Sequence, residues 1–393
     1  MQDNRYHSVI SAVDKQICLM DESNSYNAIT PPIVQSSLFS FECFEDYRNY
    51  CQHKHKQYAY TRGNNPTTNV LEDKLAKLEQ GEACRVFSSG MGAISAAIIS
   101  HLKAGEHIVF LNTIYVPTMV YAGFLERFDI SHTYLRTTDM AQLAAAITPQ
   151  TRMIYVESPG SLDLQIVNLR QLVAFAKKHE LLTIIDNTFA TPLYQKPLTL
   201  GIDIVVHSCT KYIGGHADVM AGAVITSSKL MHNIDTYGFK LHGSVISPHD
   251  SFLLLRGLRT MPSRLEALQQ PTQAVVEFLC NHPRVLKVNH PLAYPEEMKQ
   301  LYWSQANGYT GLISFELDVT GFEQVATFID SLATFHIGFS WGGYENLVLA
   351  PYVTDDFDKL KSRGLAPNLI RISLGLLDSQ TIIDDLASAL GKI

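Results

Sequence analysis

The residues best suited to chemistry stand directly after predicted strands in the middle of the chain. Lys211 closes the stretch HSCTK, where an apolar run gives way to glycines. Lysine is among the residues least often buried, so its place at the end of an interior strand needs a reason. Ser208 and Thr210 stand on the same turn, and Asp186 ends an earlier apolar strand. These residues together suggest a site that combines a reactive amine with a carboxylate and hydroxyls.

A second group of residues suits an anion and an aromatic ring. The sequence VFSSGMG places Gly90 and Met91 at the predicted start of a helix, where free N–H groups attract a phosphate. Tyr115 follows the next predicted strand and offers a face for stacking. With Lys211 and Asp186, this set meets the needs of pyridoxal phosphate. The lysine forms a Schiff base with the aldehyde, and the carboxylate keeps the pyridine nitrogen protonated.

Each residue also has a simpler interpretation when it is taken alone. A lysine at a strand end often extends its amine into solvent. An aspartate after an apolar strand is usually a cap or turn residue, and we expect Asp203 to play that part at a strand entrance. The cofactor interpretation therefore depends on the whole set, in order, at predicted strand ends.

Two other ligand classes are less well supported. The segment GMGAIS begins like a dinucleotide-binding G-x-G-x-x-G motif, but Ser95 replaces the third glycine and the next strand ends in Asn112. His53 and His55 in the short cluster HKHK would need further ligands to hold a metal, so we expect a polar loop there and no metal site.

Composition excludes several classes of protein. The chain has 393 residues and a net charge of -7 without a basic block, which argues against a nucleic-acid partner. No apolar run approaches the roughly 20 residues of a membrane helix, and no signal peptide is recognised. The six cysteines are scattered without a CxxC pair, as in reduced cytoplasmic proteins.

The order of apolar segments predicts an α/β protein with more than one domain. Strands that are apolar on both faces belong in a mostly parallel sheet covered by helices, and such sheets bind ligands at the carboxyl ends of their strands. The predicted strands of this sheet are 83–89, 107–112, 152–158, 181–186 and 203–208. We expect an N-terminal arm over 1–60, the cofactor domain over 61–256 and a smaller α+β domain over 257–393.

These residues make the chain resemble the pyridoxal-phosphate enzymes of cysteine and methionine metabolism, the trans-sulfuration enzymes. The central motif is SCTKYIGGHADVMAG, supported by YAYTRGNNPTTNVLEDKLAKLE, IDNTFATP, RGLRTMPSRL and SWGGYENL. The resemblance implies the aminotransferase type I fold, with helices on both faces of a mostly parallel sheet. It also implies a homotetramer built from two catalytic dimers.

The resemblance assigns a role to each matching residue. Lys211 is the expected Schiff-base lysine and proton shuttle, Asp186 the pyridinium partner and Tyr115 the stacking ring. The expected phosphate and substrate residues are Gly90, Met91, Ser208 and Thr210 for the phosphate; Tyr60 and Arg62 for the phosphate of the neighbouring subunit; and Arg371 and Ser340 for the substrate carboxylate. Trp341, Ser161 and Tyr60 are also expected near the substrate.

Within the family, three features resemble a bacterial-type cystathionine β-lyase: Trp341 in SWGGYE, Ser161 in VESPGS and Pro117 in YVPT. The implied reaction is β-elimination of cystathionine to homocysteine, pyruvate and ammonia, in methionine biosynthesis. Val120 and Lys240 depart from some β-lyases, and TKYIGGHADVMAGAV is more like the γ-synthases. A γ-synthase or γ-lyase reaction is the alternative, and a cofactor-fold binding protein without turnover is a remote one.

Overall fold

A seven-stranded sheet forms the centre of the larger part of the molecule. The computed structural model describes residues 6–20, 27–52, 57–354, 356–362 and 365–393. In spatial order the strands are β1 (Ala83–Phe87), β7 (Gly222–Thr226), β6 (Ile204–Ser208), β5 (Leu182–Asp186), β4 (Thr151–Glu157), β2 (His107–Leu111) and β3 (Ser131–Leu135). The five strands from β6 to β3 are parallel, and β7 is antiparallel to both of its neighbours. The predicted mostly parallel sheet is confirmed.

Helices cover both faces of this sheet because its strands are apolar on both sides. One face packs against α4 (Gly90–Ile99) and α5 (Val116–Leu125). The other packs against α7 (Leu169–Lys178), with α6 (Met140–Ala146) and α9 (Pro197–Leu200) beside it. This layered arrangement is the aminotransferase type I fold that the sequence implied.

Strand alternation decides which side chains reach the α4 and α5 side. Ile184 packs on that side and Ile185 on the opposite side, so Asp186 again points toward α4 and α5. Glu157 pairs in register with Asp186 and shares its direction. The polar residues that end β4 and β5, Glu157 and Asp186, therefore point to the same side of the sheet.

A smaller five-stranded sheet follows later in the chain. Its order is β10 (His336–Ile337), β11 (Leu347–Leu349), β12 (Leu369–Ser373), β9 (Leu312–Leu317) and β8 (Val285–Asn289). All of its pairs are antiparallel except β10 with β11. Helices α12 (Gln269–Asn281), α14 (Phe322–Asp330) and α16 (Ser379–Leu390) contribute to its core, and α13 (Glu296–Gln305) lies beside it. This is the predicted α+β arrangement.

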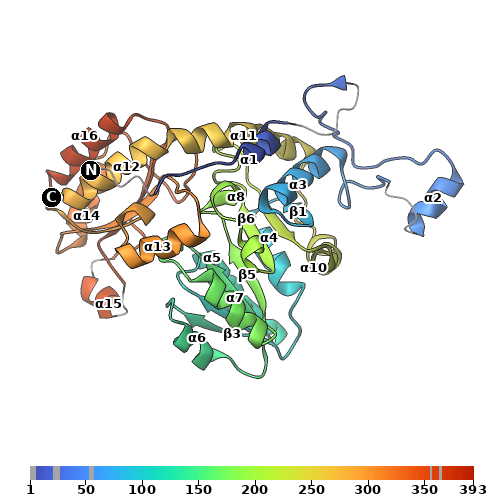
Figure 1. The fold of residues 1–393 in the computed structure, drawn as a ribbon, viewed down its shortest axis with the longest axis horizontal. Coiled ribbons are helices and arrows are strands. Elements are labelled where there is room, and N and C mark those ends of the chain that lie inside the picture. Colours follow the sequence, from blue (N-terminus) through green and yellow to red (C-terminus); the bar gives the residue numbers. More distant parts are fainter. Residues whose placement is uncertain (1–5, 21–26, 53–56, 355, 363–364) are drawn as a thin grey trace.

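One long helix, α11 (Pro248–Ala267), links the two sheets along the upper edge of the molecule (Figure 1). Leu254 and Leu265, from its two halves, belong to one continuous core with Ile213 and Phe315. The predicted domain boundary at 256 falls inside this helix. The division into domains remains a prediction.

The N-terminal segment reaches away from the body in part. Helix α1 (Ala12–Leu19) packs against α11 and α3 (Pro66–Glu79), whereas α2 (Phe44–Cys51) stands apart from both sheets (Figure 1). All the side chains of α2 are at least partly exposed, as expected of an arm that packs on something else. The remaining short helices are α8 (Thr191–Tyr194), α10 (Ser228–Asn233), α15 (Phe357–Ser362), η2 (Glu126–Phe128), η3 (Ile234–Phe239) and η4 (Pro291–Ala293).

Among the described residues, no helix is both long and apolar enough to cross a membrane. Within the same residues, no group of histidine, cysteine and acidic side chains is placed to hold a metal ion. His53 and His55 lie outside the described residues. The six cysteines are free thiols, and Cys18 and Cys209 are buried.

Candidate active site

Lys211 lies where β6 leaves the larger sheet and the chain turns. Its backbone N–H donates to Ser208 O over 3.1 Å, and its Nζ donates to Ser340 Oγ over 2.8 Å. The same Nζ lies 5.5 Å from the ring centre of Trp341. Burial and the nearby Arg371 lower the pKa of Lys211 to about 8, against the opposing pull of Asp186. The amine is therefore prepared to act as a nucleophile and base near neutral pH.

Asp186 ends β5 on the side of α4 and α5. Its Oδ1 accepts hydrogen bonds from the backbone N–H of Thr188, at 2.9 Å, and from the Thr188 hydroxyl. Burial raises the pKa of Asp186, and the Thr188 bonds act in the opposite direction. Both bonds end on Oδ1, so the Asp186 carboxylate would still have Oδ2 available to hold a protonated pyridine nitrogen.

The start of α4 lies against Ser208, at the place where the sequence predicts a phosphate cradle around Gly90. Ser89 caps the helix, and its Oγ accepts the Gly92 N–H over 3.0 Å. A Cβ at Gly90 would stand only 3.0 Å from Ser208 Oγ, so a larger residue would crowd the cradle. Met91 follows in the first turn of the same helix.

Thr210 differs from the other cradle residues. Its Oγ1 accepts the Ala221 N–H over 3.0 Å and donates to Ala221 O over 3.2 Å. The hydroxyl proton is thus used within the protein, and a role for Thr210 on the phosphate remains a prediction.

Tyr115 precedes α5, and sequence reasoning overlooked the residue that holds it. Its backbone N–H donates to Glu157 Oε1 over 2.6 Å. Glu157 is buried at the end of β4, and burial together with Asp186 raises the pKa of its carboxyl to about 8. The signal was available in the sequence, since Glu157 is a charged residue that ends an otherwise apolar strand core.

The smaller sheet supplies the expected substrate-binding residues. Arg371 is buried in β12 and donates to Ser161 O over 3.2 Å and to Phe339 O over 2.8 Å. Burial lowers the pKa of Arg371 to about 10. Contacts thus link Lys211 to Ser340 and Trp341, and link Arg371 to Ser161 and to Phe339, the chain neighbour of Ser340.

Tyr60 and Arg62 are the predicted residues that lie apart. Arg62 Nη1 donates to Lys240 O over 2.5 Å, and about half of the Tyr60 surface is exposed. No hydrogen bond between described residues joins either of them to Lys211 or Asp186. Their expected role in a neighbouring subunit's site stays a prediction.

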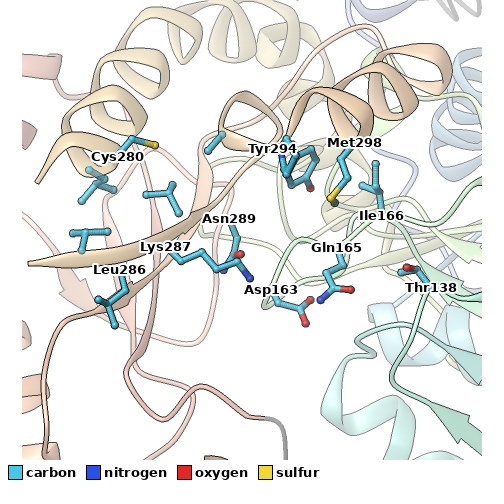
Figure 2. A pocket seen from close by; sticks show the side chains of 15 residues that line it. Thr138, Asp163, Gln165, Ile166, Cys280, Leu286, Lys287, Asn289, Tyr294 and Met298 are labelled. Atoms are coloured by element: carbon cyan, nitrogen blue, oxygen red, sulfur yellow. The ribbon is translucent and has the colours of Figure 1, made fainter.

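A cavity of about 510 Å³ lies elsewhere, between the smaller sheet and the loop after β4 (Figure 2). Lys287 from β8 faces Asp163 and Gln165 across the opening. Asp163 accepts from Thr113 over 2.6 Å and pairs with Arg136 at 3.4 Å. This carboxylate is already paired and no predicted site residue lines the cavity, so the cavity is separate from the predicted reactive centre around Lys211.

Comparison with known proteins decides the family. The profile described as Cys/Met metabolism PLP-dependent enzyme matches residues 15–391. The chain belongs to this family. The residues around Lys211 fit its cofactor, because they combine a partly buried amine of lowered pKa, a partly buried carboxylate and a helix start closed by small residues. The chain is a pyridoxal-phosphate-dependent carbon–sulfur lyase of sulfur amino-acid metabolism.

The relatives span several reactions. An L-methionine gamma-lyase of Fusobacterium nucleatum subsp. polymorphum is 39% identical over 94% of this chain and 95% of its own. A cystathionine beta-lyase of Lactococcus lactis subsp. cremoris is 35% identical over 93% and 94%. The crystal structure of cystathionine gamma synthase from Xanthomonas oryzae pv. oryzae, with aminoacrylate and cysteine, superposes with a TM-score of 0.89 at 33% identity, over 97% of each chain.

Proposed function

We propose that this enzyme is a cystathionine β-lyase, which converts cystathionine and water to homocysteine, pyruvate and ammonia. The observation that carries the proposal is the position of Trp341, whose ring centre lies 5.5 Å from Lys211 Nζ. Trp341 also packs on Tyr212, with ring centres 5.6 Å apart. An indole held beside the reactive amine favours chemistry at the Cα and Cβ atoms of the substrate over chemistry at Cγ. Ser161 and Pro117 resemble the β-lyases at two further positions.

Substrate placement follows from the smaller sheet. The planar fork of Arg371 suits a carboxylate, and its present partners are only backbone carbonyls. A substrate carboxylate would take over part of these contacts and set the Cα–H bond toward Lys211. Ser340 would steady the amine and the carboxylate at once.

Side chains of the protein would carry out the proton transfers of the reaction. Pyridoxal phosphate, when bound, supplies an aldehyde for the amine and a ring that accepts electrons from the substrate carbon. Lys211 Nζ takes the proton from Cα, because its lowered pKa leaves an available base. Asp186 keeps the ring nitrogen protonated, and the Tyr115 hydroxyl returns a proton to the departing sulfur.

A γ-elimination is the second candidate, favoured by the comparisons. The Fusobacterium relative, at 39% identity, is named for methionine γ-cleavage. The same lysine would then remove a second proton, at Cβ. Because both reactions use one base, the catalytic residues alone do not separate them.

Identification of the keto acid formed from cystathionine tests the proposal. We expect pyruvate with homocysteine, and a Lys211→Ala variant as control should form neither. Formation of 2-oxobutyrate with cysteine would replace the proposal by a γ-lyase. Incubation with methionine, and with O-acylated homoserine plus cysteine, tests the methionine γ-lyase and γ-synthase reactions directly.

We also propose that the enzyme is a cytoplasmic homotetramer composed of two catalytic dimers. Support comes from Tyr60 and Arg62, which make no described hydrogen bond to Lys211 or Asp186 of their own chain. The exposed apolar side chains along α5, Val116, Val120 and Phe124, are also consistent with a subunit contact. The molar mass in solution tests this assembly.

A further inference from the structure

Four neighbouring strands deliver one polar residue each to the same edge of the larger sheet. Lys211 follows β6, Asp186 ends β5, Glu157 ends β4 and Tyr115 follows β2. The strand order β6, β5, β4, β2 makes this also their order in space. Lys211, Asp186 and Tyr115 have roles at the cofactor, and Glu157 stands between the last two without one.

Glu157 connects the two sides of this edge. Its Oε1 accepts the Tyr115 backbone N–H over 2.6 Å, and its backbone carbonyl accepts Asn112 Nδ2 over 2.8 Å. Ser161, whose own carbonyl accepts from Arg371, also hydrogen-bonds to the Glu157 carboxyl group. The residue therefore fixes where α5 begins and where the loop to Ser161 leaves β4.

Glu157 places a second carboxyl group beside Asp186, so the charge state of the two groups must be considered together. Glu157 and Asp186 pair in register on adjacent parallel strands, which lie about 4.8 Å apart. Glu157 is buried and Asp186 partly buried, and like charges on neighbouring residues in such surroundings oppose each other. Asp186 has the Thr188 N–H and hydroxyl to support an anion. Burial and the Asp186 charge raise the pKa of Glu157 to about 8 despite its hydrogen bonds from Tyr115 and Ser161, so beside an ionised Asp186 the neutral form of Glu157 is favoured.

We propose that Glu157 is a positioning residue that acts as an uncharged acceptor. It holds the backbone of Tyr115, and with it the ring over the cofactor, without adding a second negative charge beside Asp186. The inference rests on the cofactor site described above, and its readouts do not depend on which carbon–sulfur bond is cleaved. A failed β-lyase assay would therefore leave it intact.

Glu157→Gln and Glu157→Ala separate this role from simple packing. Glutamine keeps an oxygen for the Tyr115 N–H and is neutral, so the holoenzyme should keep its cofactor dissociation constant within about twofold. Alanine removes the acceptor, and the constant should rise about tenfold, the usual effect of one lost hydrogen bond. The visible circular dichroism of bound cofactor, which reports the surroundings of the ring, should change in the alanine variant alone.

Asp203→Asn is the matched control. Asp203 is another carboxylate of the same sheet that accepts a backbone N–H, that of Thr183 at 2.8 Å, but it lies at the opposite end of the strands. Its variant should lower the melting temperature and leave the cofactor dichroism unchanged. If Glu157→Ala leaves the cofactor affinity and dichroism unchanged, Glu157 has no positioning role. If Glu157→Gln weakens cofactor binding or changes the dichroism, the claim that Glu157 acts in its uncharged form is wrong. If the alanine variant does not fold, Glu157→Asp, which withdraws the oxygen from Tyr115, takes its place.

Discussion

Lys211 Nζ donates a hydrogen bond to Ser340 Oγ over 2.8 Å. The lysine follows β6 of the larger sheet, and the serine lies between β10 and β11 of the smaller one. This bond therefore ties the reactive amine to the part of the molecule that contains Arg371. Placement of the substrate carboxylate and of the base depends on the same contact between the two sheets.

Ser340→Ala should slow catalysis while the cofactor stays bound. The amine loses the acceptor that orients it, and we expect kcat to fall about tenfold, or ~1.4 kcal/mol in activation free energy. Steady-state rates and the visible absorbance of the cofactor measure the two effects. Ser227→Ala, which removes the helix cap of α10, is the control and should leave kcat unchanged. An unaltered kcat in Ser340→Ala would show that the bond does not orient the amine.

Cofactor loading should depend on pH through Lys211. Only the neutral amine attacks an aldehyde, and burial with Arg371 lowers the pKa of Lys211 from 10.5 to about 8. Loading of the apoenzyme should therefore accelerate as the pH rises to about 8 and then level off. Removal of the Asp186 charge in Asp186→Asn should shift the midpoint to lower pH, because that charge favours the protonated amine. Stopped-flow absorbance measures the rate, and a midpoint near 10 would contradict the assignment.

The sequence predicted the strand ends well for a physical reason. Parallel strands buried on both faces read as continuous apolar runs, and the first polar residue after each run must lie at the ligand-binding edge. Asp186 and Lys211 were found in this way. Asp203 was predicted to cap a strand entrance, and its bonds to Thr183 confirm that. Strand β3 was not predicted, since SHTYL is half exposed and lacks an apolar run.

Other features needed three-dimensional information. Glu157 stands in the quoted motif VESPGS, but only the strand register shows that it lies beside Asp186. The hydroxyl of Thr210 faces the backbone of Ala221, a pairing that depends on the antiparallel strand β7. A turn residue's side chain has several rotamers, and its neighbours decide among them.

Arg371→Lys should weaken substrate binding more than turnover. Arg371 now donates to two carbonyls through two nitrogens, and lysine supplies one point charge in place of the fork. We expect kcat/KM to fall roughly 100-fold, mainly through KM, while the cofactor absorbance is kept. Arg152→Lys, at an exposed position of β4, is the control. A drop in kcat with unchanged KM would indicate a role in proton transfer instead.

Mixed oligomers test whether Arg62 serves a neighbouring subunit. Lys211→Ala and Arg62→Ala enzymes should each be nearly inactive alone. The two variants are then unfolded and refolded together. Random pairing within catalytic dimers makes half of the dimers mixed. Each mixed dimer has one site that combines the native Lys211 of one chain with the native Arg62 of the other. Activity should recover to about a quarter of the wild-type value.

Arg371→Ala with Lys211→Ala is the matched control for this experiment. Arg371 and Lys211 of one chain are connected through the neighbouring residues Phe339 and Ser340, so both belong to the same predicted site. In a mixed dimer each site then lacks one of the two residues, so refolding should restore no activity. If the Arg62 mixture behaved like this control, Arg62 would act within its own chain, and the bond from Arg62 to Lys240 O would be its working contact.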